Sequence, residues 1–457
     1  MIVMKFGGTS VVDAASIDRA ASIVKSRLDR HPLVVVSAMA KVTDALLATG
    51  RHAGNGELDR ALELSRELRE RHYSVTSELL GTATFTALHE ELQYMFDTLD
   101  ELLRGIAAVG EITPRTADMV VSYGERLNSR ICAEAFVARG MDAVQVDARQ
   151  VMITDARHGK AIPLPEEIDQ RAKEILRPLL DAGKVPVLGG FIGSSKNGAQ
   201  TTIGRGGSDF SAALFGAALN AETIEIWTDV DGMMTTDPNV CPDAHRIRVV
   251  SFEEAAELAY FGAKVLHPAT VLPAVQKNIP VRVLNSRDPK CEGTLIVARA
   301  PKTNATVKAI AVKKRITIVD VVAARMLGES GFLKAIFDVF DRHHAAVDVV
   351  STSEVSVSLT VDSNEAIPAV AADLEKIADV KYEGRKAIVC LVGENLRYRA
   401  GVAAQVFTAI RDINVRMISQ GASEINLTFV IDESDVPEVV RRLHQHFFAS
   451  PDPEVFD

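Results

Sequence analysis

Short apolar, β-branched segments alternate with long amphipathic segments over residues 1–297. The apolar segments have the length of buried strands, and the segments between them repeat apolar residues with the period of a helix. Such alternation is typical of an α/β fold with a mostly parallel sheet. The expected strands are IVMKF (2–6), LVVVSA (33–38), MDAVQV (141–146), VPVLGGF (185–191), TIEIWT (223–228), IPVRVL (279–284) and TLIV (294–297).

Residues 57–108 depart from this alternation, because they show helical periodicity with little clustering of β-branched residues. We expect them to form a helical insertion. The segment PKTNATVK (301–308) is polar and opens with proline, which is typical of a linker. The expected elements after it are shorter, so the sequence predicts a first domain of residues 1–297 and a second region of residues 298–457.

A weak internal repeat lies in the second region. GFLKAIFDVFDRHHAAVDVVSTSEVSVSLTVD (331–362) aligns without gaps to GVAAQVFTAIRDINVRMISQGASEINLTFVID (401–432). Each copy reads as helix, strand, polar turn and strand, which predicts two copies of one small βαββ module. The identical pairs are Gly331/Gly401, Phe337/Phe407, Ser353/Ser423, Glu354/Glu424 and Asp362/Asp432.

The net charge and the cysteine content limit the classes of binding partner and the cellular compartment that we expect. The chain has 51 Lys and Arg against 61 Asp and Glu, a formal net charge of −10, so we expect no binding to nucleic acid or to anionic membranes. Its 4 cysteines are scattered without a CxxC pattern, which favours a reducing, cytoplasmic compartment over a zinc cluster or a disulfide framework. The chain enters a strand at once and has no long apolar run, so we expect no signal, transit or membrane segment.

Two glycine-rich segments of the first domain could bind phosphate, although neither has the P-loop or dinucleotide pattern. In KFGGTS (5–10), glycines expose backbone amides at the end of a strand and Lys5 adds charge; the alternative is a tight turn with a surface lysine. In TTIGRGGSDFSAALFG (201–216), Arg205 could bind a carboxylate or phosphate through two hydrogen bonds. Ser208 and Asp209 there fit the N-cap and first turn of a helix.

Two further segments have polar residues near the ends of expected elements. WTDVDGMMTTDPN (227–239) ends a strand in an acidic turn, but Met233 stands at a calcium-ligand position, so a plain Asp-Gly turn is the alternative. In FGAKVLHP (261–268), Lys264 follows a helical segment. It could bind phosphate or simply complement the helix dipole.

Together, and in this order, these four segments resemble the motifs of the aspartokinases of the amino acid kinase family. SYGE (122–125), GFIGS (190–194) and TTDP (235–238) also match, and the resemblance covers nearly the whole chain. Aspartokinases transfer the γ-phosphoryl group of MgATP to the β-carboxylate of L-aspartate, giving the acyl phosphate that opens lysine, threonine and methionine synthesis. The resemblance implies an amino acid kinase fold, with Mg²⁺ held mainly by ATP phosphates and water.

The resemblance also assigns roles to residues at the substrate. Lys5 and the amides of Gly7 and Gly8 would hold the transferring phosphoryl group. Asp209 would organise the site rather than act as a base, because a carboxylate nucleophile is already ionised at neutral pH. Glu125, which could otherwise be a surface residue of an amphipathic helix, would bind the α-ammonium of aspartate. The implied aspartate contacts are Thr43, Glu125, Arg205 and Ser208.

The implied nucleotide contacts depart from the family pattern at two positions. Many aspartokinases carry a tyrosine where Met234 stands and an arginine where Asn239 stands. This leaves a catalytically silent amino-acid sensor as an alternative, and another family member, such as acetylglutamate, glutamate or uridylate kinase, as a second. The implied nucleotide contacts are Lys5, Phe6, Gly7, Gly8, Thr228, Asp229, Met234, Asn239, Lys264 and Val265.

The repeat resembles the tandem ACT domains of aspartokinases, which are ferredoxin-like βαββαβ modules that bind an amino acid between modules and often between subunits. This implies modules at about 313–385 and about 386–457, with strand 307–312 completing the second. It also implies a homodimer through the ACT domains, or a tetramer built from it. No homoserine dehydrogenase domain follows, so we expect a monofunctional enzyme.

The segments MLGESGFL (326–333) and VDVVSTSEVSVSLT (347–360) are most similar to the lysine-inhibited class, which makes L-lysine the expected inhibitor. Asp348 and Glu354 suit a ligand with a second ammonium group, whereas threonine offers no charge to pair with them. The alternative is that both acids are solvated turn residues. The residues implied to line this site are Met326, Gly331, Phe332, Leu333, Val347, Asp348, Ser353 and Glu354.

Overall fold

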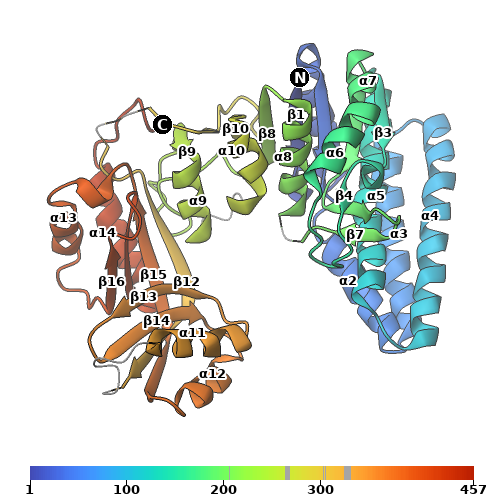
Figure 1. Cartoon of the computed structure of the whole chain (residues 1–457). Helices are drawn as coiled ribbons and strands as arrows, with labels where there is room; N and C mark the ends of the chain where they lie inside the picture. Colours follow the sequence, from blue (N-terminus) through green and yellow to red (C-terminus); the bar gives the residue numbers. More distant parts are fainter. Residues whose placement is uncertain (205, 263–267, 302, 304, 324–330) are drawn as a thin grey trace. The chain divides into compact units, whose positions relative to one another are not determined.

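The chain divides into two compact units in the computed structural model, which describes residues 1–457 except 205, 263–267, 302, 304 and 324–330 (Figure 1). The first unit is Met1–Gly232 with Val265–Ala300, and the second is Met233–Lys264 with Pro301–Asp457. Residues 233–264, which the sequence places inside the first domain, therefore group with the second unit.

The first unit is built on a parallel sheet in which the strand order is β3-β5-β2-β1-β8-β10, with β11 antiparallel beside β10. Most of its strand residues are buried, because helices cover a parallel sheet on both faces and strands there become continuous apolar runs. The predicted parallel α/β architecture is confirmed. The strands are β1 (Ile2–Phe6), β2 (Pro32–Val36), β3 (Ala143–Val146), β5 (Val185–Gly189), β8 (Thr223–Thr228), β10 (Val281–Asn285) and β11 (Thr294–Val297).

Strand β1 shows how the two faces are used. Ile2, Met4 and Phe6 belong to the core that the sheet shares with α1, α2 and α5, whereas Val3 lies on the opposite face, against α8. Because side chains alternate along a strand, Lys5 must also lie on the α8 face. The helices are α1 (Ala14–Lys25), α2 (Val42–Gly54), α5 (Pro114–Ala138), α6 (Pro165–Arg171), α7 (Arg177–Asp181), α8 (Gly207–Leu219) and α10 (Leu272–Gln276).

The predicted helical insertion is confirmed as two long helices, α3 (Leu58–Leu79) and α4 (Thr82–Val109). They pack with α2 and α5 and extend the core of the first unit (Figure 1). A small sheet that the sequence did not predict contains β4 (Ile153–Thr154), β6 (Ile192–Ser195) and β7 (Gln200–Thr202). These strands are too short to give a clear alternating pattern.

The second unit contains a six-stranded antiparallel sheet in the order β13-β14-β12-β15-β17-β16. Strands β12 (Ala309–Val322) and β15 (Asp379–Val392) run through both halves of it, and each changes register near an arginine with positive φ, Arg315 or Arg385. The strand predicted at 307–312 is therefore the first half of β12, where it pairs with the end of β15. The other elements are β9 (Val249–Ser251), α9 (Phe252–Tyr260), α11 (Phe332–Arg342), β13 (Val347–Thr352), β14 (Ser356–Asp362), α12 (Ile367–Leu374), α13 (Val402–Ala409), β16 (Met417–Gln420), β17 (Asn426–Asp432) and α14 (Val436–Phe448).

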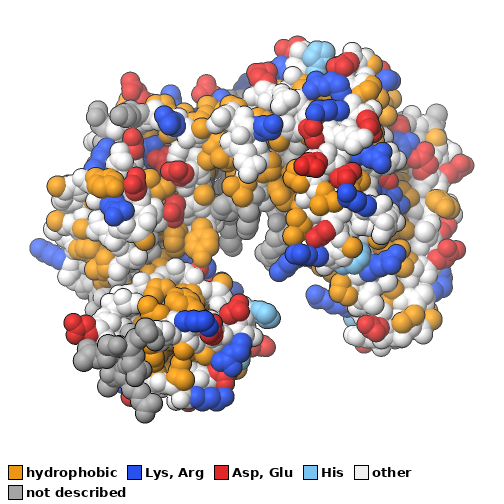
Figure 2. Space-filling view, viewed as in Figure 1, with side chains coloured by type: hydrophobic (Ala, Val, Ile, Leu, Met, Phe, Trp, Pro, Cys, Tyr) orange, Lys and Arg blue, Asp and Glu red, His pale blue; other side chains and the backbone are white. Residues whose placement is uncertain are grey.

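The surface carries charges of both signs. Figure 2 shows Lys and Arg side chains interspersed with Asp and Glu side chains over the visible face of each unit. Among the described helices, none is both long and apolar enough to cross a membrane.

The internal repeat is confirmed in the structure. Each copy runs helix, strand, turn and strand, and its helix begins after the glycine shared by the two copies. Gly331 is the N-cap of α11 with φ of 93°, and Gly401 is the N-cap of α13 with φ of 84°. The identity at this position follows from a backbone conformation that residues with a Cβ rarely adopt.

We predict that Gly401→Ala lowers the free energy of unfolding by about 1 kcal/mol, the approximate cost of placing an L-residue in the left-handed region. A Cβ at Gly401 would meet no atom within 4 Å, so a clash would not contribute. The measurement is chemical denaturation followed by circular dichroism. The matched control is Gly105→Ala inside α4, which also points into open space but lacks a positive φ; it should raise stability instead. Equal effects of the two substitutions would contradict this account.

Candidate active site

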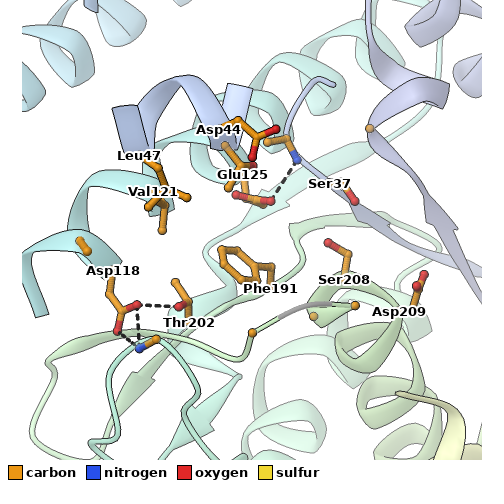
Figure 3. A pocket seen from close by; sticks show the side chains of 18 of the residues that line it. Ser37, Asp44, Leu47, Asp118, Val121, Glu125, Phe191, Thr202, Ser208 and Asp209 are labelled. Atoms are coloured by element: carbon orange, nitrogen blue, oxygen red, sulfur yellow. Dashed lines mark hydrogen bonds between the residues drawn. The ribbon is translucent and has the colours of Figure 1, made fainter. Parts of the chain in front are cut away.

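A cavity of about 660 Å³ opens in the first unit at the carboxyl-terminal edge of the parallel sheet. Its lining comes from the ends of β1 and β2, from the loop after β5, from the beginnings of α2 and α8, and from one face of α5 (Figure 3). Ligands of open α/β sheets bind at this edge, outside the carboxyl ends of the strands. Of the residues to which the sequence assigned roles, those lining it are Lys5, Gly8, Thr43, Glu125, Ser208 and Asp209.

Lys5 and Asp209 form an ion pair inside this cavity. The Lys5 Nζ lies 2.6 Å from the Asp209 Oδ1, and the two side chains are only 10% and 13% exposed. Asp209 lies in the first turn of α8, on the face of the sheet to which strand alternation directs Lys5. Because removing either partner would leave a charge poorly solvated, the pair fixes the position of the lysine. The surface-lysine alternative is therefore excluded.

The glycines before α8 are required by the local backbone conformation and by close packing. The N-cap of α8 is Gly206 with φ of 72°, rather than Ser208 as the sequence suggested, and Ser208 is buried within the first turn. Gly204 also has a positive φ of 81°. A Cβ on Gly207 would come within 2.7 Å of the Phe191 ring. The glycines thus allow α8 to begin directly at the cavity wall.

The two glycines after β1 differ in whether their backbone amides are available to bind a ligand. The Gly7 amide donates a hydrogen bond of 3.0 Å to the Trp227 carbonyl, so it is committed to the sheet. Gly8 lines the cavity, and a Cβ there would lie 2.8 Å from the Ala38 carbonyl oxygen. Of the two amides expected to hold phosphate, the one at Gly8 is the better placed.

Four predicted nucleotide contacts near the ends of β1 and β8, namely Phe6, Gly7, Thr228 and Asp229, are not among the described residues that line the cavity. The Phe6 side chain is fully buried against Trp227, with ring centroids 6.1 Å apart, and its carbonyl accepts a hydrogen bond from the Ser37 amide. Thr228 and Asp229 end β8, where the Thr228 hydroxyl donates to the Asp229 carboxylate at 3.3 Å.

Glu125 is buried with one carboxylate oxygen unsatisfied (Figure 3). Its Oε1 accepts a hydrogen bond of 3.1 Å from the Ala38 amide, while its Oε2 has no hydrogen-bond partner among the described residues. Burial raises the pKa of Glu125 to about 8, so this carboxyl is mostly protonated at neutral pH. An ammonium group entering the cavity would supply the missing partner and favour the ionised form. The surface-helix alternative for Glu125 is excluded.

Asp118 is a residue of this site that the sequence analysis missed. Its buried carboxylate accepts hydrogen bonds from the Thr202 hydroxyl (2.6 Å), the Gly159 amide (3.0 Å) and a ring nitrogen of His158 (2.9 Å), as Figure 3 shows in part. It thereby joins α5 to β7 and to the loop at 155–161. Asp118 precedes Glu125 by seven positions, or about two helical turns, and this spacing could have identified it.

Two further lysines line the cavity without having been singled out from the sequence. Lys41 is the N-cap of α2 and has a positive φ of 70°, and Lys160 lies in the loop that Asp118 holds. Both side chains are exposed. Among the described residues, these two lysines and Lys5 share the cavity lining with four carboxyl side chains.

Two other predicted nucleotide contacts, Met234 and Asn239, do not line this cavity. Met234 bridges to Arg246 and Asn239 donates to the Asp237 carboxylate, and both positions belong to the second unit. The predicted residues that lie outside the described part of the chain are Arg205, Lys264, Val265 and Met326.

The predicted lysine site is spread along one strand of the second unit. Val347 and Asp348 begin β13, while Ser353 and Glu354 follow its end, with Glu354 exposed. Thr352 follows Asp348 by four positions of strand, a distance of about 13 Å at 3.3 Å per residue. Phe332 and Val347 pack against the core of this half, and Gly331 and Leu333 lie at the start of α11. Within one chain, the two acids therefore lie at opposite ends of β13.

Comparison with known proteins agrees with this architecture. Residues 1–285 match the amino acid kinase family, and residues 319–373 and 389–447 match the ACT domain. The predicted amino acid kinase fold followed by ACT modules is therefore confirmed. The first unit and its cavity define a kinase of the amino acid kinase family, and the second unit carries its ACT domains.

One curated protein and two solved structures narrow the class further. Lysine-sensitive aspartokinase 3 of Escherichia coli (strain K12) is 38% identical over 98% of this chain and 99% of its own length. The crystal structure of E. coli aspartokinase III with aspartate and ADP (R-state) superposes with a TM-score of 0.85 at 37% identity, covering 98% of this chain and 100% of that one. The complex with lysine and aspartate (T-state) gives 0.84 at 38% identity, covering 98% and 99%. The chain belongs to the aspartokinase family.

We predict that Glu125→Gln stabilises the unliganded protein more at pH 9 than at pH 5. The folded-state pKa is raised from 4.5 to about 8, so wild-type stability falls as pH rises through that window and the loss is complete above it. The glutamine variant lacks this loss and should gain at least about 1.4 kcal/mol relative to wild type between these pH values, the equivalent of one pKa unit. Chemical denaturation at both pH values gives the comparison.

Glu101→Gln, on an exposed position of α4, is the matched control and should show no such pH dependence. A difference between wild type and Glu125→Gln that does not change from pH 5 to pH 9 would show that Glu125 titrates normally.

Proposed function

We propose that this protein phosphorylates the β-carboxylate of L-aspartate with MgATP, giving 4-phospho-L-aspartate and ADP, and that L-lysine inhibits it. The observation that carries the proposal is a single cavity in which Lys5, fixed by Asp209, lies with Glu125, a buried acid that has an unused oxygen. The first group suits a phosphoryl group, and the second suits the ammonium of an amino acid.

The reaction needs charge more than proton transfer. A β-carboxylate oxygen of aspartate attacks the γ-phosphorus; its O–P bond forms as the bond from phosphorus to the β,γ-bridging oxygen breaks, and ADP leaves with that electron pair. No proton is removed from the nucleophile, so no general base is required. Lys5 and the Gly8 amide would stabilise the charge on the phosphoryl oxygens. Mg²⁺, held mainly by ATP phosphates and water, would neutralise the remaining phosphate charge.

Recognition of aspartate follows from the groups around Glu125. Its carboxylate would pair with the α-ammonium, while Arg205 would bind a substrate carboxylate through two hydrogen bonds. Thr43 and Ser208, which line the same cavity, would add polar contacts. Asp209 would orient Lys5 and would not act as a base.

The nucleotide would extend from the phosphate site toward the ends of β1 and β8. The proposed contacts of its phosphates are Lys5, Gly8 and Lys264. The other nucleotide contacts implied by the family motifs remain proposals at Phe6, Gly7, Thr228, Asp229, Met234, Asn239 and Val265.

We also propose residues 1–297 as the catalytic domain and 298–457 as the regulatory region, with both acting in the cytoplasm. The separation of Asp348 from Glu354 along β13 supports a lysine site shared by two chains, each supplying one of these acids. A homodimer through the ACT domains would bring the two halves of the site together.

The proposed reaction is tested by a coupled assay of ADP release with L-aspartate, L-glutamate or no acceptor. We expect ADP only with aspartate. ADP formation with glutamate alone would favour another amino acid kinase, and no ADP with either acceptor would favour a silent sensor.

The role of Arg205 gives a sharper prediction. Arg205→Ala should raise the KM for aspartate by about 100-fold, since a charge-assisted pair contributes roughly 3 kcal/mol, while the affinity for ATP changes little. Arg205→Lys should recover only part of this, because lysine cannot form the same paired hydrogen bonds. Steady-state kinetics and ATP titration provide the measurements, and unchanged aspartate kinetics in the alanine variant would overturn the assignment.

The shared lysine site predicts complementation between chains. Asp348→Asn and Glu354→Ala homodimers should each lose lysine inhibition, because each lacks one acid at both sites. Refolding an equimolar mixture should restore inhibition in part, since a heterodimer keeps one site with both acids. If the mixture is no more sensitive than the separate variants, the two acids do not act across the dimer.

A further inference from the structure

The buried acid of the predicted lysine site already holds an ammonium group from its own chain. Asp348 has a side chain only 2% exposed, and both of its oxygens lie close to the Lys313 Nζ, at 2.9 and 2.8 Å. The Tyr260 hydroxyl donates a third hydrogen bond to it at 2.6 Å. All three residues belong to the second unit. In this state the negative charge of Asp348 is fully compensated.

Lys313 has a second partner nearer to solvent. Its Nζ lies 3.0 Å from Asp362, whose side chain is 60% exposed. Two ammonium groups on one buried carboxylate leave an uncompensated positive charge and repel each other. A ligand ammonium that approaches Asp348 must therefore displace Lys313, and Asp362 allows Lys313 to leave without losing all of its ionic contacts.

The internal repeat provides a comparison within the same chain. In the gap-free alignment of 331–362 with 401–432, the position of Asp348 is taken in the second copy by Ile418. The acid at the end of the copy is retained, and there too it pairs with a lysine, since Lys386 contacts Asp432. A module of this kind therefore folds without the buried acid, which indicates that Asp348 serves another purpose in the first copy.

We infer that Lys313 is an internal occupant of the effector's ammonium site and determines which effectors can bind. This inference rests on the proposed inhibition by L-lysine. The side-chain ammonium of the effector replaces Lys313 at Asp348, and Lys313 keeps only its contact with Asp362. An amino acid with a neutral side chain, such as threonine, would leave Asp348 buried without a cation, which is strongly unfavourable.

Displacement of Lys313 by the effector would also change a contact at the end of α9. Tyr260 is its last residue, and Lys313 lies 5.4 Å from the centroid of the Tyr260 ring, in a cation–π contact. Two positions later, Gly262 packs so closely on β12 that a Cβ would lie 2.3 Å from the Val312 carbonyl oxygen. Displacing Lys313 therefore removes a contact from the segment that leads in sequence to Lys264.

The test is calorimetric titration of the full-length protein with L-lysine and with L-norleucine, which has the same four-carbon side chain without the terminal ammonium. Wild type should bind lysine and not norleucine. Lys313→Met should bind lysine about tenfold more tightly or better, because the internal competitor is gone. The matched control, Lys314→Met at the exposed neighbouring position of β12, should bind as wild type does. Unchanged or weaker binding by Lys313→Met would overturn the inference.

Two further variants extend the test: Lys313→Gln controls for misfolding, and Tyr260→Phe tests the link to α9. Lys313→Gln keeps a polar side chain that can donate to Asp348, and it should show the same direction of change; a melting temperature raised by lysine would show that it is folded. Tyr260→Phe should bind lysine yet be inhibited less, relative to its own uninhibited rate. Full inhibition of Tyr260→Phe would contradict the link to α9.

Failure of the inference is distinguishable from failure of the proposed function. If lysine inhibits the wild type but Lys313→Met binds it no more tightly, only the role of Lys313 is wrong. If the wild type phosphorylates aspartate but does not bind lysine, the regulatory proposal and this inference both fall, while the catalytic proposal stands.

Discussion

The ion pair between Lys5 and Asp209 is the contact on which the active site depends. One partner ends a central strand of the sheet and the other begins a buried helix, so their 2.6 Å contact ties the sheet to α8 at the edge where ligands bind. With so little exposure, neither charge is well solvated alone. A phosphate that enters the cavity therefore meets a lysine already held in position, which lowers the cost of organising the site during the reaction.

The two proposed ligand sites contain buried carboxylates in opposite states. Glu125 has an unsatisfied oxygen and a raised pKa, so its burial is unfavourable until an ammonium group pairs with it. Asp348 already has Lys313 and Tyr260 as partners. Aspartate would thus complete a site, whereas lysine must exchange with a group that is present. On the proposed function, this difference would explain how one chain recognises two amino acids through the same chemistry and responds differently to each.

Much of the fold could be predicted from the sequence because its signals are local. The parallel strands are continuous apolar runs, the insertion has helical periodicity over two long helices, and the repeat retains the N-cap glycines Gly331 and Gly401. The motifs also brought Lys5, Glu125 and Asp209 to one cavity. Each of these features depends on residues close together in the sequence or on a motif of fixed spacing.

The features that could not be predicted depend on contacts between distant segments. The Gly7 amide donates a hydrogen bond to Trp227, which lies more than 200 residues away. Asp118 accepts hydrogen bonds from a loop and a strand that follow it by 40 residues or more. Lys41 lines the cavity in a left-handed conformation that sequence pattern does not reveal. The grouping of residues 233–264 with the second unit likewise arises from tertiary packing.

The central claim is that Lys5, positioned by Asp209, stabilises the phosphoryl group during its transfer to aspartate. It is tested most directly by a single-turnover measurement of acyl phosphate formation, trapped as the hydroxamate, in wild type and Lys5→Met at saturating ATP and aspartate. The account predicts that the variant remains folded and loses about 10²–10³-fold in the transfer rate, the range typical for removing one preorganised electrostatic group. A transfer rate within a few fold of wild type would contradict it.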